Sequence, residues 1–400
     1  MSSVSKDLIR QMVKEEQFGS TKEIMEAIKG MFKDVLQEAM EAELDEQLGY
    51  ERYEKSEVSN RRNGHSKKTV KSEFGEIEIA VPRDRNGEYE PKLIPKHSRS
   101  VEGLEEKVIS LYAAGLSTRD IHAQIKELYG VEISAEQVSR ITDRVLPLLT
   151  DWQSRPLEAA YPFVFMDAIH YKVRDEKQIV SKAAYVVLGI NSDGYKEVLG
   201  IWIGQAESSK FWLSVLNELR NRGVRSVNVF CVDGLNGFKE AISATFPNAR
   251  VQRCIIHQIR SSTKYVSYTD IKTFMKDLKL VYGAATEEEA LGALANLQET
   301  WGKKYPSAIK SWEQNWDVLA TFFIFSPEIR KIIYTTNAIE SLHRQFRKVT
   351  KTKAVFPTEQ SLLKMLYLAT DRIQRKWTMR YRGWDQVLSQ IEILFDPEVA

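Results

Sequence analysis

The feature that most constrains the fold is a block of apolar, β-rich segments in the middle of the chain. These segments are residues 163–166, 183–190, 197–203, 227–232 and 250–256. The first three predict an antiparallel meander, and a helical pattern at 209–222 separates the third from the fourth. A meander that is followed by a crossover helix and further buried strands predicts an α/β fold with one mixed sheet.

Length and composition favour a globular protein of two or three domains. The 400 residues are 43% hydrophobic and 28% charged, and a domain takes roughly 150 residues. Cys231 and Cys254 are too few for a disulfide framework. The N-terminus lacks the apolar segment of a signal peptide, and no apolar run reaches the ~18 residues of a membrane span. We therefore expect a cytoplasmic protein with no membrane partner.

Charge is distributed unevenly along the chain. Residues 1–57 hold 14 acidic and 8 basic residues, whereas residues 330–383 hold 13 basic and 3 acidic residues. Residues 61–71 hold five basic residues and no acidic one. This asymmetry points to a polyanion partner, but solvated helix faces are the better explanation of any single run, so charge alone settles little.

Three regions precede the β-rich block. Residues 1–58 form an acidic amphipathic helical region, because apolar residues recur at steps of three and four between 22 and 48. Residues 59–100 combine a basic segment with a short β element at 74–82, where apolar and polar residues alternate.

Residues 101–150 are predicted to be a helix-turn-helix-like DNA-binding region. Ser117 begins one helix, and Ser134 begins a second with Gln137 in a capping box. The second helix would bury 138, 141, 145 and 148 and expose Arg140 and Arg144 to a major groove. An ordinary helical hairpin remains the alternative.

The rest of the chain divides into three parts. Residues 151–258 hold the β-rich block, residues 259–330 carry little strand signal, and residues 331–400 are basic and helical. Helices are predicted at 271–282, 287–301, 309–323, 337–351 and 359–377.

Three carboxylates are candidate site residues. Asp167 directly follows the strand predicted at 163–166, and Asp233 follows the strand predicted at 227–232. Carboxylates at strand ends can converge at one edge of an α/β sheet, where sites are commonly found. Aspartates also simply terminate strands, so both interpretations stay open.

The third candidate, Glu340, lies on a helix face that also carries cations. Glu340, Arg344, Arg347 and Lys351 follow one another at steps of four, three and four. A capping role, with Asn337 as the N-cap, is the alternative, but it does not explain the cations. Two Asp and one Glu suit a pair of divalent ions, and the cations suit phosphates. Arg344 is also placed to steady the Glu340 carboxylate.

Several motifs resemble those of the Mutator-like transposases of bacterial insertion sequences. The longest is residues 334–342 (YTTNAIESL), continued by Arg344, Arg347, Lys348 and 350–357 (TKTKAVFP). Further matches are 166–169 (MDAI), 189–194 (GINSDG), 231–235 (CVDGL) and 254–258 (CIIHQ). The resemblance covers nearly the whole chain, and His343 departs from it because the family more often has Asn there.

The resemblance implies an RNase H-like catalytic core with a DDE triad, preceded by a mainly helical N-terminal DNA-binding region. Asp167, Asp233 and Glu340 match the triad as catalytic and metal-binding residues. The 107 positions from Asp233 to Glu340 are too many for a simple connection. Residues 259–330 would therefore be an all-helical insertion, with 151–258 as the first part of the core and 331–400 as the catalytic Glu helix and basic C-terminal helices.

The implied activity is that of a DNA transposase. It would bind the terminal inverted repeats of its insertion sequence and cleave and transfer DNA strands with two divalent metal ions, Mg²⁺ or Mn²⁺. Its partners would be double-stranded terminal and target DNA and a second copy of itself in a homodimer. The candidate DNA-binding residues are Arg140, Arg144, Arg344, Arg347, Lys348, Lys351 and Lys353.

Cys254, His257 and Asn337 are candidate supports of the active site. Cys254 and His257 match a Cys-x-x-His element of the family, although ordinary packing explains them as well. A zinc site is not expected, because Cys231 is the only other cysteine. Two other functions remain as alternatives: a DNA-binding regulator derived from a transposase, and a plain RNase H-like nuclease.

Overall fold

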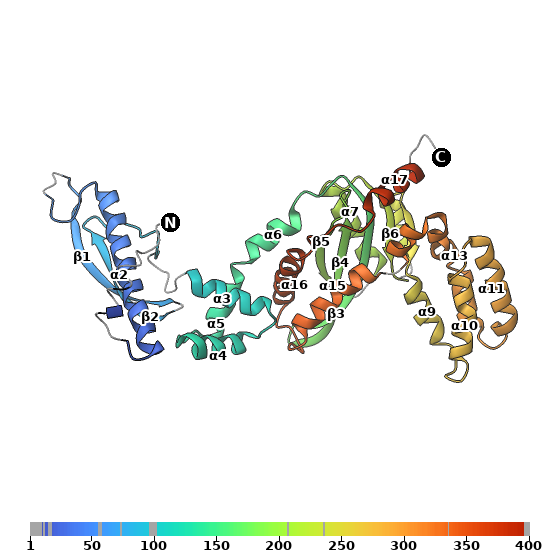
Figure 1. The fold of residues 1–400 in the computed structure, drawn as a ribbon, viewed down its shortest axis with the longest axis horizontal. Coiled ribbons are helices and arrows are strands. Elements are labelled where there is room, and N and C mark those ends of the chain that lie inside the picture. The colour runs from blue at the N-terminus through green and yellow to red at the C-terminus, as the bar shows by residue number, and fades with distance from the viewer. Residues whose placement is uncertain are drawn as a thin grey trace. The chain divides into compact units, whose positions relative to one another are not determined.

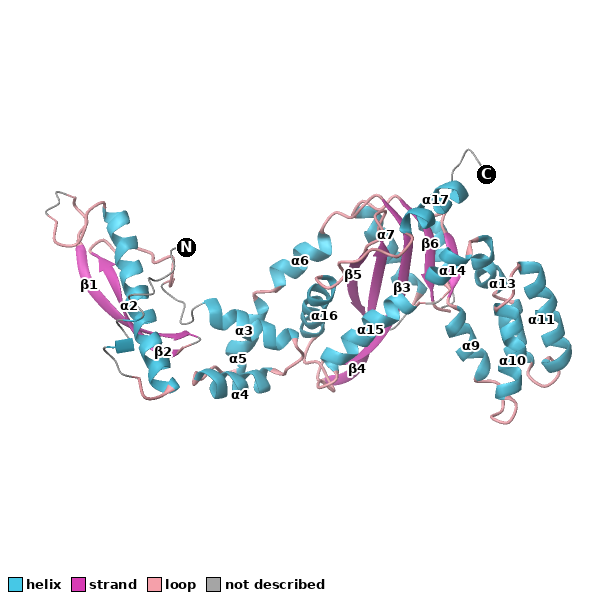
Figure 2. Ribbon diagram, in the orientation of Figure 1, coloured by secondary structure: helices cyan, strands magenta, loops and turns pink. Residues whose placement is uncertain are grey.

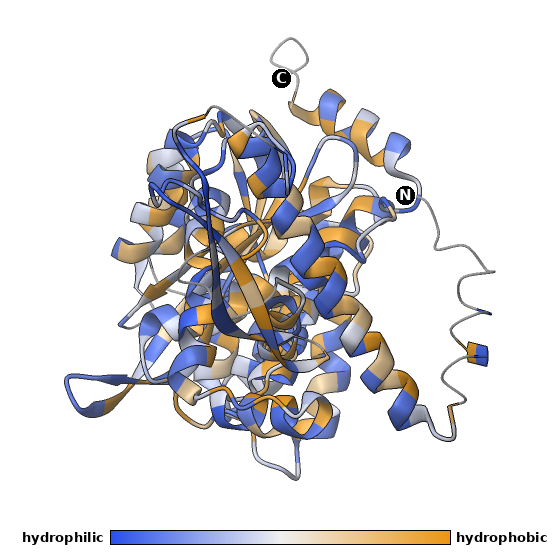
Figure 3. Cartoon of the chain, turned by 90° about the vertical axis from the view of Figure 1, so that its left-hand side faces the viewer, coloured by the Kyte–Doolittle hydropathy of each residue, from blue (hydrophilic) through white to orange (hydrophobic). Residues whose placement is uncertain are grey.

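The protein is described by a computed structural model. It covers residues 10, 13–14, 18–54, 58–72, 74–95, 102–205, 208–234, 237–334 and 336–395. The chain forms two compact units, Met1–Asp143 and Arg144–Ala400 (Figure 1). Helices in both units carry apolar and polar residues, orange and blue in Figure 3, as expected of elements that bury one face.

In the first unit, helix α2 (Thr21–Leu48) packs on a hairpin of β1 (Arg62–Ser72) and β2 (Gly75–Asp84). The Ser20 side chain accepts a hydrogen bond from the Glu23 backbone, and Gly49 ends the helix with φ 75°. The predicted helix and the predicted strand are thus confirmed. Their apolar faces form one cluster of Leu36, Met40, Val70, Ile77, Ile79, Val81 and Ile94.

The basic residues 61–71 lie mainly in strand β1, which the sequence pattern did not predict. Arg62 Nη1 lies 2.6 Å from Glu41 Oε2 on α2. Lys67 and Lys71 pair with Glu78 and Glu76 across the hairpin, at 3.1 and 3.9 Å. Much of this basic run is therefore balanced within its own unit, and it gives no support for a polyanion partner.

Three short helices follow: α3 (Glu102–Ala113), α4 (Thr118–Tyr129) and α5 (Ala135–Asp143). They contact one another in all three pairs. Ser117 and Asp120 form a capping box on α4, and Ser134 and Gln137 exchange the same two hydrogen bonds at α5. Both predicted helix starts are confirmed.

The prediction that the second of these helices continues to Leu148 is wrong. Helix α5 ends at Asp143, Arg144 and Val145 form a turn, and α6 (Leu146–Ser154) begins with Pro147 in its first turn. Proline cannot continue a helix, because it lacks the N–H and its ring clashes with the carbonyl four residues earlier. Leu148 is consequently 59% exposed.

The second unit is built on a five-stranded mixed sheet (Figure 2). Its strands are β3 (Ala160–Asp175), β4 (Gln178–Ile190), β5 (Lys196–Gly204), β6 (Ser226–Val232) and β7 (Arg250–Arg253). The spatial order is β5-β4-β3-β6-β7, with the first three antiparallel and the last two parallel to β3. Helix α7 (Ser209–Asn221) makes the crossover. The predicted meander, crossover helix and mixed sheet are confirmed.

Helices cover the sheet. Helices α7 and α8 (Phe238–Thr245) share one apolar cluster with the strands, including Trp212, Phe238 and Met166. Helices α15 (Asn337–Thr350) and α16 (Glu359–Gln374) also contact the strands. Phe163 of β3 lies outside that cluster and packs edge-on against Trp384, with ring centroids 6.1 Å apart. This contact places Trp384, from the C-terminal part of the chain, against β3, next to which α15 also lies.

Helices fill the interval between β7 and α15. They are α9 (Ile255–Thr263), α10 (Ile271–Tyr282), α11 (Glu287–Trp301), α12 (Pro306–Glu313), α13 (Trp316–Leu319), the 3₁₀ helix η1 (Ala320–Ile324) and α14 (Pro327–Ile333). The helices α10 and α11 have the predicted bounds. The predicted strand 250–256 is wrong beyond Arg253, because Ile255 begins α9. The predicted helix 309–323 is broken into α12, α13 and η1. Helices α8 and α17 (Trp384–Phe395) were not predicted.

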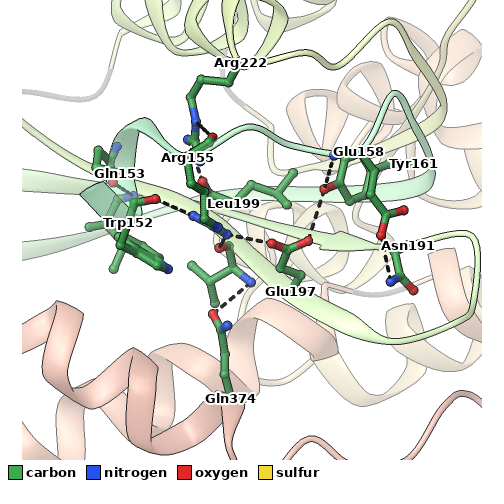
Figure 4. Close-up of polar contacts among 12 residues, drawn as sticks. Trp152, Gln153, Arg155, Glu158, Tyr161, Asn191, Glu197, Leu199, Arg222 and Gln374 are labelled. Carbon is green, nitrogen blue, oxygen red and sulfur yellow. Dashed lines mark hydrogen bonds and ion pairs between the residues drawn. The ribbon is translucent and has the colours of Figure 1, made fainter. Parts of the chain in front are cut away.

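Strand β5 lies at an edge of the sheet, and side chains form hydrogen bonds with its backbone N–H and C=O groups (Figure 4). The amide oxygens of Gln153 and Gln374 accept hydrogen bonds from the backbones of Ile201 and Val198. Arg155 donates to the Val198 carbonyl and to Glu197, both at 2.7 Å. These contacts leave less of the edge open to another strand. Among the described residues, no helix is long and apolar enough to cross a membrane.

We expect Arg222→Met to lower the free energy of unfolding of the second unit by about 2 kcal/mol. Arg222 is 8% exposed. Its Nε and Nη1 donate to the carbonyls of Arg155 and Leu199, at 2.9 and 2.7 Å, and methionine leaves both carbonyls without these donors. Urea unfolding measures the change. The exposed Arg225→Met is the matched control, and an equal loss there would contradict the explanation.

Candidate active site

Strand register places Asp167 and Asp233 side by side. Met166 of β3 is paired with Val232 of β6 in parallel register, so the aspartates are the next residues on neighbouring strands. The prediction that Asp167 ends its strand is wrong, because β3 continues to Asp175 by pairing with β4. Strand β6 does stop before Asp233. Asp167 therefore lies within a strand, where it is 8% exposed.

Helix α15 supplies Glu340 from its first turn. The N-cap is Thr336, so Asn337 is the first helical residue and does not cap Glu340 as the alternative required. The Thr336 hydroxyl lies 3.4 Å from both Glu340 Oε1 and Cys254 Sγ. Thr336 thus connects the start of α15 to the start of α9.

His343 joins α15 to the sheet. Its Nδ1 lies 3.3 Å from Asp167 Oδ2, and its side chain is 3% exposed. The sequence singled out His343 only as a departure from a family pattern and missed this contact. The available signal was its position three residues after Glu340, which places the two residues on adjacent parts of one helix surface.

Two side chains of α9 lie close to Glu340. His257 Nε2 is 3.6 Å and Arg260 Nη1 is 3.7 Å from Glu340 Oε1. Glu340 makes these ion pairs and none with Arg344 within the described part of the chain, so the expectation that Arg344 steadies the carboxylate is not met.

Electrostatics connect His257 to all three carboxylates. Its interaction with Cys254, together with the charges of Asp167 and Asp233, raises the pKa of His257 to about 9 against the effect of burial. Burial raises the pKa of the Cys254 thiol, but interactions with His257 and Thr336 outweigh it, so the net pKa is lowered. Cys254 and His257 therefore lie where the sequence predicted support for the site.

The three carboxylates have the chemistry that a hard cation prefers, but their arrangement in this structure does not form a metal site. Carboxylate oxygens are the ligands that Mg²⁺ and Mn²⁺ prefer. Within the residues that the structure describes, however, no three His, Cys, Asp or Glu side chains are close enough to hold a metal ion together. Glu340 is instead held near Thr336, His257 and Arg260.

The predicted basic face of α15 is exposed to solvent. Arg344, Arg347, Lys348 and Lys351 are exposed and border a shallow hollow on this helix. No ion pair involves these four side chains across the described residues. Lys353 differs from them, because its ammonium lies 5.8 Å from the centre of the Phe356 ring.

The two arginines predicted for a major groove lie on different elements. Arg140 is exposed on α5, whereas Arg144 is exposed in the turn after it and begins the second unit. Arg140 therefore keeps the predicted position on a helix face, and Arg144 does not.

Comparisons with known proteins extend over most of the chain. The family described as "Transposase, Mutator family" matches residues 3–380. The transposase for insertion sequence element ISRM3 of Rhizobium meliloti (strain 1021) is 44% identical over 357 residues, covering 89% of each chain. A probable insertion sequence transposase of Corynebacterium diphtheriae is 37% identical over 80% of this chain and 99% of its own. The IS905 transposase of Lactococcus lactis subsp. lactis (strain IL1403) is 34% identical over 94% and 96% of the two chains.

Proposed function

The chain belongs to the Mutator family of transposases, and from that premise we propose that it binds the terminal inverted repeats of its own insertion sequence and catalyses metal-dependent DNA strand cleavage and strand transfer. We place this chemistry in an RNase H-like core with Asp167, Asp233 and Glu340 as a DDE triad. The sheet order, with three antiparallel strands followed by two parallel ones, supports that assignment.

One observation carries the proposal: adjacent strands and two histidines link Asp167, Asp233 and Glu340, which are far apart in sequence. The strand register sets Asp167 beside Asp233, and His343 connects Asp167 to the helix that bears Glu340. His257 lies 3.6 Å from Glu340 and responds to the charges of both aspartates. Such a concentration of acidic groups is costly unless cations balance it.

The three carboxylates would hold two divalent ions, Mg²⁺ or Mn²⁺, since their oxygens match the chemistry of these ions. When bound, such ions lower the pKa of an attacking water and stabilise a leaving oxygen. The chain's own residues have separate tasks. His343 orients Asp167, the α9 side chains hold Glu340, and the exposed cations of α15 bind DNA phosphates.

We also propose functions for the N-terminal region and for residues 259–330. We assign sequence-specific DNA binding to the N-terminal region, and we interpret 259–330 as a helical insertion in the core. We also propose that a homodimer acts in the cytoplasm on double-stranded terminal and target DNA, because two ends require two active sites. Sedimentation with and without terminal DNA measures the stoichiometry.

A cleavage assay with the purified full chain tests the function. The substrate is duplex DNA from the sequence that flanks the gene, and the products are separated on a denaturing gel after incubation with Mg²⁺ or Mn²⁺. We expect cuts at the transposon end and, with target DNA added, joined strands. Scrambled ends are the control, and a chain that cuts neither its own ends nor joins them with either metal would overturn the proposal.

We expect Arg347→Ala and Lys351→Ala to weaken binding to every DNA sequence alike. Both side chains are exposed on α15 without an ion pair in the described structure, so they are free to contact phosphates. Each lost phosphate contact should flatten the slope of log K against log salt by about 0.9. Titrations at several salt concentrations measure this slope. Unchanged slopes would mean that this helix face is only solvated.

A further inference from the structure

A hollow of about 430 Å³ beside Asp233 is lined by three permanent cations among its residues. Asp233 and Gly234 follow β6, Arg253 ends β7, and Arg260, Ser261 and Lys264 come from the end of α9. His257 of α9 also borders the hollow. Arg260 pairs with Glu340, so Arg253 and Lys264 remain against Asp233, and this excess of positive charge favours an anion.

Arg253 is the most enclosed of these cations. It is the register partner of Val232, so its side chain begins next to Asp233. Its Nη1 lies 2.5 Å from Asn315 Oδ1, whereas its Nε is buried and has no hydrogen-bond partner among the described residues. Burial lowers the pKa of Arg253, and the charge of Asp233 opposes that effect. Arg253 is therefore held in place by Asn315 and by close packing over Gly234, with its guanidinium at the border of the hollow.

Gly234 makes room for this guanidinium. A Cβ at position 234 would overlap Nη2 and Cζ of Arg253. The φ angle of Gly234 is not positive, so the glycine allows the guanidinium to lie close to the backbone and is not there for backbone freedom. The sequence analysis assigned no role to Gly234, whereas the structure shows that it leaves space for Arg253.

We propose that this hollow is a subsite for one phosphodiester group of the DNA backbone, bound by Arg253 from the sheet and by Lys264 from the end of α9. The inference rests on the proposed DNA-cleaving function and adds where the strand passes beside Asp233. A phosphodiester offers one negative charge and two acceptor oxygens, which match a guanidinium edge and an ammonium. Lys264 is exposed and makes no ion pair in the described part of the chain. Arg260, in contrast, forms an ion pair with Glu340.

The test uses the full chain and terminal duplexes in which one phosphate at a time is replaced by a neutral methylphosphonate. With the wild type, we expect one replacement near the cut to weaken binding about tenfold. Arg253→Gln and Lys264→Ala should bind the unmodified duplex about tenfold more weakly and lose sensitivity to that same replacement. The exposed Lys276→Ala on α10 is the matched control and should keep it. Thermal unfolding of each variant verifies that it is folded.

Gly234→Ala gives an independent test, because it should displace the guanidinium without removing it. We expect it to weaken binding as Arg253→Gln does, and the double variant should be no weaker than either single one. Gly292→Ala, where a Cβ would meet nothing within 4 Å, is the control.

The outcomes separate this inference from the function on which it rests. If the wild type binds and cuts its ends but the variants keep the full methylphosphonate sensitivity, the subsite is overturned and the transposase function stands. If the wild type does not bind its ends at all, both are overturned. Binding needs no strand cleavage, so a defect in chemistry alone cannot imitate either result.

Discussion

Asp167→Asn, Asp233→Asn and Glu340→Gln are each expected to reduce strand cleavage by at least about a thousandfold. Each change removes one negative charge at nearly constant volume, and therefore a ligand for a divalent ion. A loss of several kcal/mol of transition-state stabilisation corresponds to this factor. The measurement is a single-turnover cleavage assay with terminal DNA and Mg²⁺ or Mn²⁺.

Binding and chemistry should separate in these variants. Terminal DNA should bind each of them with nearly the wild-type affinity, because the carboxylates do not attract phosphates. The exposed Asp193→Asn and Glu328→Gln are matched controls that should cut normally. Near-normal cutting by any triad variant would mean that the residue is not part of the active site. Loss of cutting in a control would mean that the loss comes from a folding defect and not from a missing metal ligand.

The second large effect concerns DNA recognition by the first unit. A fragment of residues 1–143 forms a compact unit with its own apolar clusters. We expect it to bind terminal DNA about 10³-fold more tightly than scrambled DNA, the low end of what specific binding domains achieve. Equal binding to both sequences in a fluorescence titration would place recognition elsewhere in the chain.

Arg140 is the side chain that we expect to read a base in this unit. It is exposed on α5, and a bidentate arginine contact contributes about 1–3 kcal/mol of discrimination. Arg140→Ala should therefore reduce the preference for terminal DNA by roughly 5- to 150-fold. Arg119→Ala, exposed on α4, is the matched control. A larger loss of preference there would move the recognition surface to α4.

Much of the fold was predictable because its signals are local. Apolar spacing identified α2, α10 and α11, and capping residues identified the starts of α4 and α5. The strand pattern was harder to recognise in a segment rich in charged residues. Strand β1 is rich in basic residues that pair with acidic ones elsewhere, so its sequence did not look like a strand.

By itself, the sequence determined the order of the five central strands and their crossover helix, the α/β fold class and the positions of three candidate carboxylates. The tertiary structure decided which side chains meet them: His343 at Asp167, and His257 and Arg260 at Glu340. It also showed that Asp167 lies within β3 and that Arg253 lies over Gly234. Periodicity and capping depend on neighbours within a turn or a strand, whereas these contacts depend on strand register and helix packing between residues far apart in the chain.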